Sequence, residues 1–107
     1  EPIAHFQGLQ WMLADMATDI AAARQLGLAA ARKREGGERF SMEASMAKLH
    51  ASEMVGRVTD KALQIHGGYG FTTALPLERY MRDCRIFRIY EGSSEIQRNI
   101  IARHLLG

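Results

Sequence analysis

Apolar residues recur at steps of three and four along the first third of the chain, as they do on one face of an amphipathic helix. Many alanines and the absence of proline after Pro2 give this segment a matching helix propensity. We predict a helix from about residue 3 to residue 34, ended at Gly36 and Gly37, where the chain can reverse. The face predicted to pack consists of Phe6, Leu9, Leu13, Met16, Ile20, Ala23, Gly27 and Ala30.

A second apolar stripe predicts another long helix, from about residue 42 to residue 66. Ser41 is its expected N-cap, and Glu43 in the first turn complements the helix dipole. Small residues on both contact faces allow the two helices to pack closely and antiparallel. The stripe consists of Ala47, Ala51, Met54 or Val55, Val58, Ala62 and Ile65.

The last third of the chain predicts shorter elements. Three glycines within residues 67–70 make continued α-helix costly. Pro76 is expected to open a third helix over residues 77–84, and Ser93 with Ser94 to cap a fourth that runs to about Leu106. We therefore predict an all-α, antiparallel helical bundle of two long and two shorter helices, forming one domain over residues 1–107. The buried side of the fourth helix is expected to be Ile96, Ile100, Ile101 and Leu105.

Composition excludes several classes of protein. The 107 residues are 47% hydrophobic and 24% charged, with a net charge of only +2, which is typical of an ordered globular domain and does not favour nucleic acid as a partner. There is no run of 18 apolar residues, so no membrane span is expected. A single cysteine, Cys84, fits a reducing compartment. Because the chain starts at Glu1 and enters a helical pattern almost at once, we expect a fragment of something longer.

Metal and nucleotide motifs give little. The histidines have no i,i+4 His partner and no cysteine pairing, so no metal site is predicted; they are His5, His50, His66 and His104. The glycines of residues 67–70 follow a helix and do not form the GxGxxG of a dinucleotide-binding loop. They either end a helix in a turn or let the backbone approach a ligand closely.

Glu91 is the most informative single residue. It follows the apolar run of residues 86–90 and precedes Gly92, just before a capped helix. A carboxylate placed there can be aimed into a cleft and desolvated, which raises its pKa and suits a general base. The alternative is that Glu91 only complements the dipole of the last helix.

Several segments together resemble the C-terminal domain of the acyl-CoA dehydrogenase family. They occur in the family's order and spacing and cover essentially the whole chain. They are QIHGGYGF at residues 64–71, MRDCR at 81–85 and IYEGSSEIQR at 89–98, with Phe6, Gln7 and LADMA at 13–17 on the first helix.

The resemblance implies an FAD-dependent enzyme that oxidises an acyl-CoA thioester to the trans-2-enoyl-CoA. Glu91 matches the family's α-proton-abstracting glutamate, and its backbone N–H matches a donor to the thioester carbonyl. Tyr90 and Gly92 match positions that line the substrate site. The first set of implied FAD contacts, made to the cofactor of a neighbouring subunit, is Gln7, Gln64, Ile65, His66, Gly67 and Gly68.

A second set of implied contacts, Ser93, Ser94 and Glu95, reaches the FAD of the same subunit. Many relatives have threonine at the position of Ser93 and glutamine at that of Glu95. Serine keeps the hydroxyl, but a carboxylate cannot donate hydrogen bonds and repels phosphate. This departure puts the role of Glu95 in doubt.

The resemblance also implies partners and a compartment. These are an acyl-CoA substrate, an electron-transfer flavoprotein as electron acceptor, a homotetramer, and a place in fatty acid or amino acid catabolism, in the cytoplasm of a bacterium or the mitochondrial matrix of a eukaryote. The alternatives are an acyl-CoA oxidase-like flavoprotein and a non-enzymatic helical interaction module. Glu91 and the glycine segment are the features that separate an enzyme from such a module.

Overall fold

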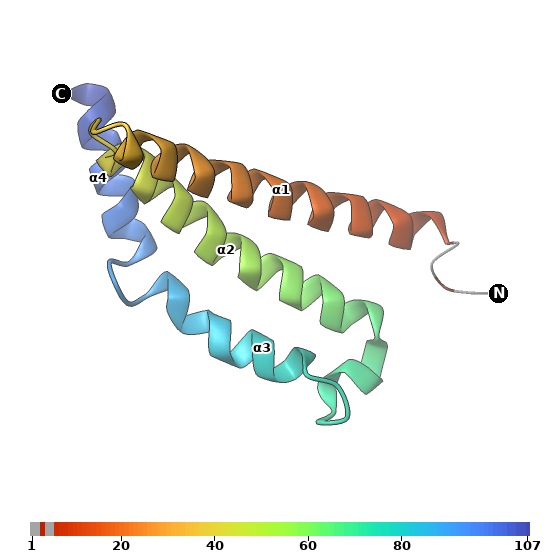
Figure 1. Ribbon diagram of the computed structural model, residues 1–107. Coiled ribbons are helices and arrows are strands. Elements are labelled where there is room, and N and C mark those ends of the chain that lie inside the picture. The colour runs from red at the N-terminus through yellow and green to blue at the C-terminus, as the bar shows by residue number, and fades with distance from the viewer. Residues whose placement is uncertain (1–2, 4–5) are drawn as a thin grey trace.

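The computed structural model describes residue 3 and residues 6–107, and these residues form helices and turns without a strand. The elements are α1 (Gln7–Glu35), α2 (Ser41–Ile65), the 3₁₀ helix η2 (Gly67–Phe71), α3 (Leu77–Cys84), the 3₁₀ helix η3 (Arg85–Arg88) and α4 (Ser94–Leu106). The molecule is elongated, 53 × 26 × 25 Å. Figure 1 shows α1 and α2 as an antiparallel pair, with α3 beside α2 and α4 across one end. The predicted all-α bundle is confirmed.

The reversal between α1 and α2 follows from the two glycines. Gly36 caps α1 by donating to Arg32 O, and Gly37 takes a positive φ of 72° that favours glycine. Lys33 Nζ then meets Glu43 Oε1 at 2.8 Å across the turn. Helix α1 begins at Gln7 rather than at residue 3, and residues 4 and 5 lie outside the described part of the chain.

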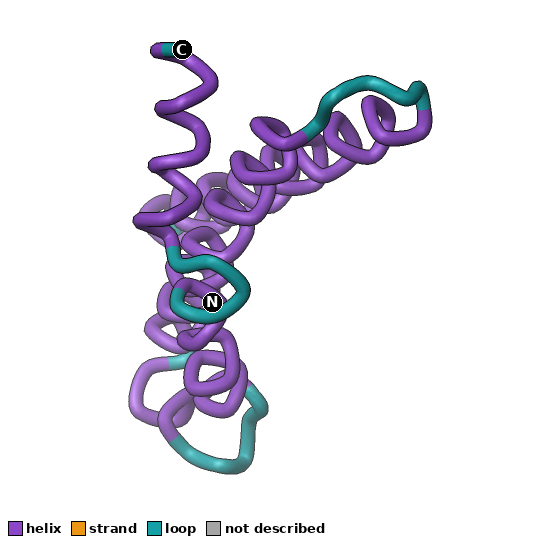
Figure 2. Tube along the Cα trace, turned by 90° about the vertical axis from the view of Figure 1, so that its left-hand side faces the viewer, coloured by secondary structure: helices purple, strands orange, loops and turns teal. Residues whose placement is uncertain are grey.

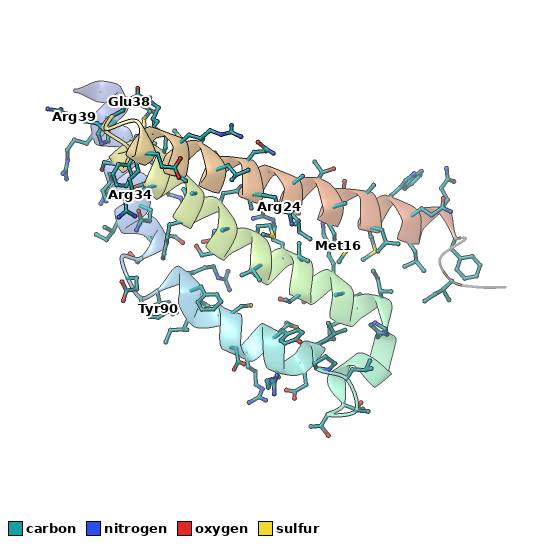
Figure 3. All side chains as sticks on the ribbon, viewed as in Figure 1. Met16, Arg24, Arg34, Glu38, Arg39 and Tyr90 are labelled. Carbon is teal, nitrogen blue, oxygen red and sulfur yellow. The ribbon has the colours of Figure 1, made fainter. Side chains whose placement is uncertain are left out.

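The packing face of α1 was only half correct. Leu9, Met16, Ala23 and Ala30 are buried or half-buried against α2, as predicted, and Figure 3 shows Met16 between the two helices. Four predicted core residues are instead exposed: Phe6, Leu13, Ile20 and Gly27. The helix carries apolar residues on more than one side, so periodicity alone could not say which side meets α2.

Helix α2 is the centre of the domain and packs against α1, α3 and α4. Its most buried polar residues, Ser45, Ser52 and Thr59, lie on one side about two turns apart. Ser52 Oγ donates to Lys48 O at 2.6 Å and Thr59 Oγ1 to Val55 O at 2.7 Å, which satisfies these buried hydroxyls. The residues of the predicted stripe are half-buried rather than buried.

Two predicted caps had different outcomes. Ser41 is the first helical residue of α2 rather than its N-cap, which is Phe40, with no side-chain cap hydrogen bond. Ser93 is the N-cap of α4, as predicted, and its Oγ accepts from Ile96 N at 3.3 Å. Pro76 stands at the start of α3 as expected. The glycine segment leaves the α-helix but continues as η2, a tighter 3₁₀ helix.

The predicted buried side of α4 was wrong at two positions. Ile96 and Leu105 are exposed, Ile100 and Ile101 are half-buried, and the buried residues are Ser94 and Gln97. Figure 2 shows α4 leaving α2 at an angle, with its C-terminal end standing apart from the α1–α2 turn. The polar side of α4 faces inward because its side chains bond the residues that precede it and α2.

Candidate functional site

The predicted site residues fall into two groups at opposite ends of the molecule. Residues 90–95 lie in the connection between η3 and α4 and in the first two residues of α4, at one end of the domain (Figure 1). Residues 64–68 lie at the other end, where α2 finishes and η2 begins. Gln7, the first residue of α1, is at that second end because α1 and α2 are antiparallel. Within one chain the two groups of residues therefore belong to two separate sites.

The backbone at Glu91 has a left-handed conformation, with φ of 57°. It is the non-glycine residue with positive φ in the described part of the chain. Such a conformation costs roughly 1–3 kcal/mol in a residue with a Cβ and persists only where the surroundings impose it. Strain of this kind clusters at functional sites, which makes Glu91 a stronger candidate than its sequence context alone did.

Glycine is favoured at position 92 by the backbone conformation, because φ is 87°, a region that side chains disfavour. A Cβ built there would lie 2.6 Å from Gln97 Nε2, so the end of that side chain would have to move and its bonds to the turn would be disturbed. The pair Glu91–Gly92 thus turns the chain sharply just before Ser93 caps α4.

Two side chains hold this turn. Lys48 Nζ, from the middle of α2, donates to Phe87 O at 2.7 Å and to Gly92 O at 2.6 Å. Gln97 Nε2, from the first turns of α4, donates to Gly92 O at 3.3 Å and to Glu91 O at 3.5 Å. The carbonyl groups around Glu91 are therefore bonded to α2 on one side and to α4 on the other.

An apolar cleft of about 440 Å³ adjoins Glu91. Phe87 and Tyr90 form one part of its wall, stacked with ring centroids 5.9 Å apart. Figure 3 shows Tyr90 projecting from the α3–α4 connection toward α2. The other wall comes from α2 and consists of Lys48, Ala51, Ser52, Met54 and Val55. A carboxylate at the edge of such a cleft can act on a ligand whose apolar part lies inside it.

The start of α4 is tied to α2 through Glu53. Ser94 Oγ donates to Glu53 Oε1 at 2.8 Å, and Arg88 Nη1 donates to Glu53 Oε2 at 3.4 Å. The Ser94 hydroxyl and then Arg88 hold the pKa of the Glu53 carboxyl below its usual range, although partial burial acts the other way. The Ser94 hydroxyl is thus engaged within the domain. Glu95 is exposed, and its Oε1 lies 3.8 Å from Arg98 Nη1.

The glycine segment presents open backbone. Gln64, His66, Gly67 and Gly68 are exposed and Ile65 is half-buried. No atom lies within 4 Å of a Cβ built at Gly67 or Gly68. Gly70 differs, because its Cβ would lie 2.6 Å from Leu63 O, so that glycine is required by packing. At Gly67 and Gly68, therefore, another molecule could approach the backbone closely.

No group of three or more His, Cys, Asp and Glu side chains that could hold a metal ion comes together within the described residues. His5 lies outside them. Nor does any helix among the described residues combine the length and the apolarity needed to cross a membrane.

Sequence reasoning missed Lys48, Gln97 and Glu53. Nothing in their local sequence marks them, because their partners lie elsewhere in the chain or, for Gln97, depend on the turn geometry before α4.

Comparison of the sequence with known proteins identifies the family of the chain. Residues 1–106 match the model of the acyl-CoA dehydrogenase C-terminal domain. Among curated relatives, the acryloyl-CoA reductase (NADH) of Anaerotignum propionicum is 53% identical over 99% of this chain and 27% of its own length. A subunit of the caffeyl-CoA reductase–Etf complex of Acetobacterium woodii is 47% identical, over 97% and 27%. The mitochondrial short-chain specific acyl-CoA dehydrogenase of Rattus norvegicus is 49% identical, over 98% and 26%.

A solved structure of a protein from the same family has the same fold in this region. Butyryl-CoA dehydrogenase from Megasphaera elsdenii is 43% identical and superposes with a TM-score of 0.97, over 100% of this chain and 28% of that one. The fold and the site define a helical domain in which a glutamate with a strained backbone lies beside an apolar cleft. The chain belongs to the acyl-CoA dehydrogenase family, as its C-terminal domain. It spans about a quarter of the length of the relatives it matches, which occur in bacteria and in mitochondria.

Proposed function

We propose that the chain is the base-bearing C-terminal part of an FAD-dependent acyl-CoA dehydrogenase, with Glu91 as the catalytic base. The enzyme would convert an acyl-CoA thioester to the trans-2-enoyl-CoA. The observation that carries this proposal is the strained backbone of Glu91, with φ of 57°, beside the apolar cleft. A carboxylate that only complemented a helix dipole would not require that conformation.

The proposed chemistry begins with proton removal. The Glu91 carboxylate takes the α-proton of the thioester, and the electrons of the broken Cα–H bond become part of the new Cα=Cβ double bond. FAD, when bound, supplies the acceptor for the β-hydrogen, which leaves as hydride. The acyl chain would lie along Tyr90 and Gly92, and the Glu91 backbone N–H would donate to the thioester oxygen as negative charge develops there. The Glu91 side chain is exposed in this domain, so the apolar walls of the cleft would exclude water from the reacting atoms only when the rest of the protein covers them.

The two ends of the domain would meet two different cofactors. Ser93 and Glu95 stand close to Glu91 and would contact the FAD of the same active site, whereas Ser94, which is buried with its hydroxyl bonded to Glu53, would hold this segment in place. At the other end lie the residues proposed to contact the FAD of a neighbouring subunit: Gln7, Gln64, Ile65, His66, Gly67 and Gly68. Because the two groups are separated along α2, each active site would be completed by a second subunit, in a homotetramer of the full-length protein.

An electron-transfer flavoprotein is the proposed electron acceptor. One relative is named as a subunit of a reductase–Etf complex, which supports this partner class. The proposed compartment is the cytoplasm in a bacterium or the mitochondrial matrix in a eukaryote. An acyl-CoA oxidase, in which oxygen reoxidises the flavin, would use the same residues.

A second candidate function is the reverse reaction, reduction of an enoyl-CoA. It is favoured by the relatives named acryloyl-CoA reductase and caffeyl-CoA reductase. In that direction Glu91 would return a proton to the α-carbon. Which direction prevails depends on the electron partner rather than on the residues of this domain.

The test uses the full-length protein with bound FAD. Glu91→Gln keeps the shape of the side chain and removes the proton acceptor. Stopped-flow absorbance measures how fast the flavin bleaches on mixing with saturating acyl-CoA. We expect this rate to fall by about 10²–10⁴-fold, the range for a lost general base. Glu38→Gln, an identical change at an exposed residue of the α1–α2 turn, serves as the control. A Glu91→Gln enzyme that bleaches at the wild-type rate would remove Glu91 from the mechanism.

A further inference from the structure

One ammonium group holds the chain on both sides of Glu91. Lys48 Nζ donates to Phe87 O at 2.7 Å and to Gly92 O at 2.6 Å, so its two bonds enclose the segment that carries Glu91. We propose that Lys48 is a positioning residue, which sets the place and backbone conformation of the Glu91 carboxylate. This inference rests on the function proposed for Glu91.

The two restraints on the turn differ in strength. Gln97 Nε2 is a neutral donor at 3.3 and 3.5 Å, whereas Lys48 is a charged donor at shorter range. Charge-assisted hydrogen bonds are roughly twice as strong as neutral ones. Lys48 is also the restraint that comes from outside the local segment. Without it, the carbonyl groups of Glu91 and Gly92 would be held only by the weaker bonds from Gln97, and the left-handed φ of Glu91 could relax.

Lys48 can restrain the turn because it belongs to α2, the central helix of the domain. Helix α2 packs against α1, α3 and α4 and is the most enclosed element of the domain. By contrast, Glu91 belongs to a short connection with an exposed side chain. Lys48 ties that connection to the central helix, so that the carboxylate keeps a fixed position relative to the cleft. Proton transfer demands such precision, since a displacement of about 1 Å can cost ~10²-fold in rate.

The experiment compares Lys48→Met with Lys61→Met in the full-length enzyme containing FAD. Methionine keeps an unbranched apolar side chain and removes the three N–H donors. Lys61 lies further along the same helix. For Lys48→Met we expect flavin reduction by saturating acyl-CoA to slow by about 10- to 100-fold, with unchanged FAD content and an unchanged substrate dissociation constant. Lys61→Met should leave all three values at the wild-type level.

Two companion variants guard against a merely structural effect. Lys48→Arg keeps hydrogen-bond donors near the two carbonyl groups, so it should restore most of the rate. Lys48→Gln removes the charge and shortens the donor's reach but keeps a polar side chain, and it provides a folded comparison if Lys48→Met is unstable. Amide hydrogen exchange supplies a readout besides activity. Peptides covering residues 87–97 should exchange faster in Lys48→Met and unchanged in Lys61→Met.

A double variant separates this inference from the proposed function. If Lys48 acts only through Glu91, adding Lys48→Met to Glu91→Gln should slow flavin reduction no further. If the losses in rate of the two single variants multiply in the double variant, the positioning role is overturned. It is also overturned if Lys48→Met reduces flavin at the wild-type rate, or if its only defect is weaker substrate binding. A Glu91→Gln enzyme that reduces flavin normally would instead overturn the proposed function.

Discussion

Glu91 combines a strained backbone with a reactive group, and its neighbours show how the strain is sustained. Gly92 accepts the following positive φ at no steric cost, and its carbonyl oxygen is the acceptor shared by Lys48 and Gln97. The turn is thus over-determined by groups from α2 and α4. This is the condition under which strain of about 1–3 kcal/mol persists in a folded protein.

Gly92→Ala should disturb this turn directly. The new Cβ would lie 2.6 Å from Gln97 Nε2 and displace the end of that side chain, and the alanine backbone would have to adopt a φ of 87°. We expect the full-length enzyme to lose at least ~1 kcal/mol of stability, because alanine cannot take this conformation without strain. Urea unfolding measures the loss, and flavin reduction should slow as Glu91 shifts.

Gly27→Ala is the matched control, since Gly27 lies in α1 with no atom within 4 Å of a Cβ at its position. Alanine in a helix interior should leave the free energy of unfolding unchanged or raise it. Equal losses in the two variants would mean that the turn at Gly92 is not specially constrained.

At this scale the sequence pointed to Glu91 as the candidate carboxylate but not to the residues that hold it. Glu91 could be singled out from its apolar and glycine neighbours, and the resemblance implied a role for it that stays a prediction. Lys48, Glu53 and Gln97 could not, because a hydrogen bond between residues 39 or more positions apart, or one that depends on an αL turn, leaves no local pattern.

Among the elements, the junction of α2, η3 and α4 depends on one carboxylate. Glu53 accepts from Ser94 and Arg88, and these two donors lower its pKa from the ordinary value of 4.5. A lowered pKa in the folded state means that the contribution of Glu53 to stability is fully present above about pH 4.5. It is lost as the pH falls through the folded-state value.

We therefore expect Glu53→Gln to make stability less dependent on pH below 4.5. The free energy of unfolding of wild type and variant, measured by urea titration between neutral and acidic pH, should converge as the pH falls. Asp60→Asn, at an exposed position of the same helix, should keep the wild-type pH dependence. Parallel curves for wild type and Glu53→Gln would contradict the assigned role of the Glu53 carboxylate.

The elements themselves were largely predictable, and their orientation was not. Glycine, proline and serine at the element ends placed α2, α3 and α4 within a residue or so. The buried sides of α1 and α4 were misassigned because both helices carry apolar residues on outward faces. Ile96 on α4 looked like core, yet Ser94 and Gln97 are the residues that turn inward.

For the whole molecule, those outward apolar faces are the main feature. Trp11, Leu13 and Ile20 are exposed on α1, as is Phe6 just before it, and Leu105 and Leu106 are exposed on α4. Exposed apolar surface of this extent marks interaction sites. The chain also spans about a quarter of its relatives' length, so the faces would be covered by the rest of the protein and by neighbouring subunits.

We expect the full-length protein to sediment as a homotetramer, or at least as a dimer, because each proposed FAD site draws residues from two subunits. Charged substitutions on α1, Leu13→Glu with Ile20→Glu, should shift the assembly toward smaller species and lower its flavin content together. Ala21→Glu with Ala22→Glu adds the same charge at exposed alanines of α1 and tests whether charge alone suffices. A monomer that binds FAD tightly would contradict this account.

The most direct test of the central claim follows the α-proton itself. Full-length enzyme with FAD and acyl-CoA is placed in D₂O without an electron acceptor, and deuterium at the α-carbon is measured by mass spectrometry. If Glu91 removes and returns this proton, wild type incorporates deuterium and Glu91→Gln does so at least ~10²-fold more slowly. Incorporation by Glu91→Gln at the wild-type rate would show that another group is the base.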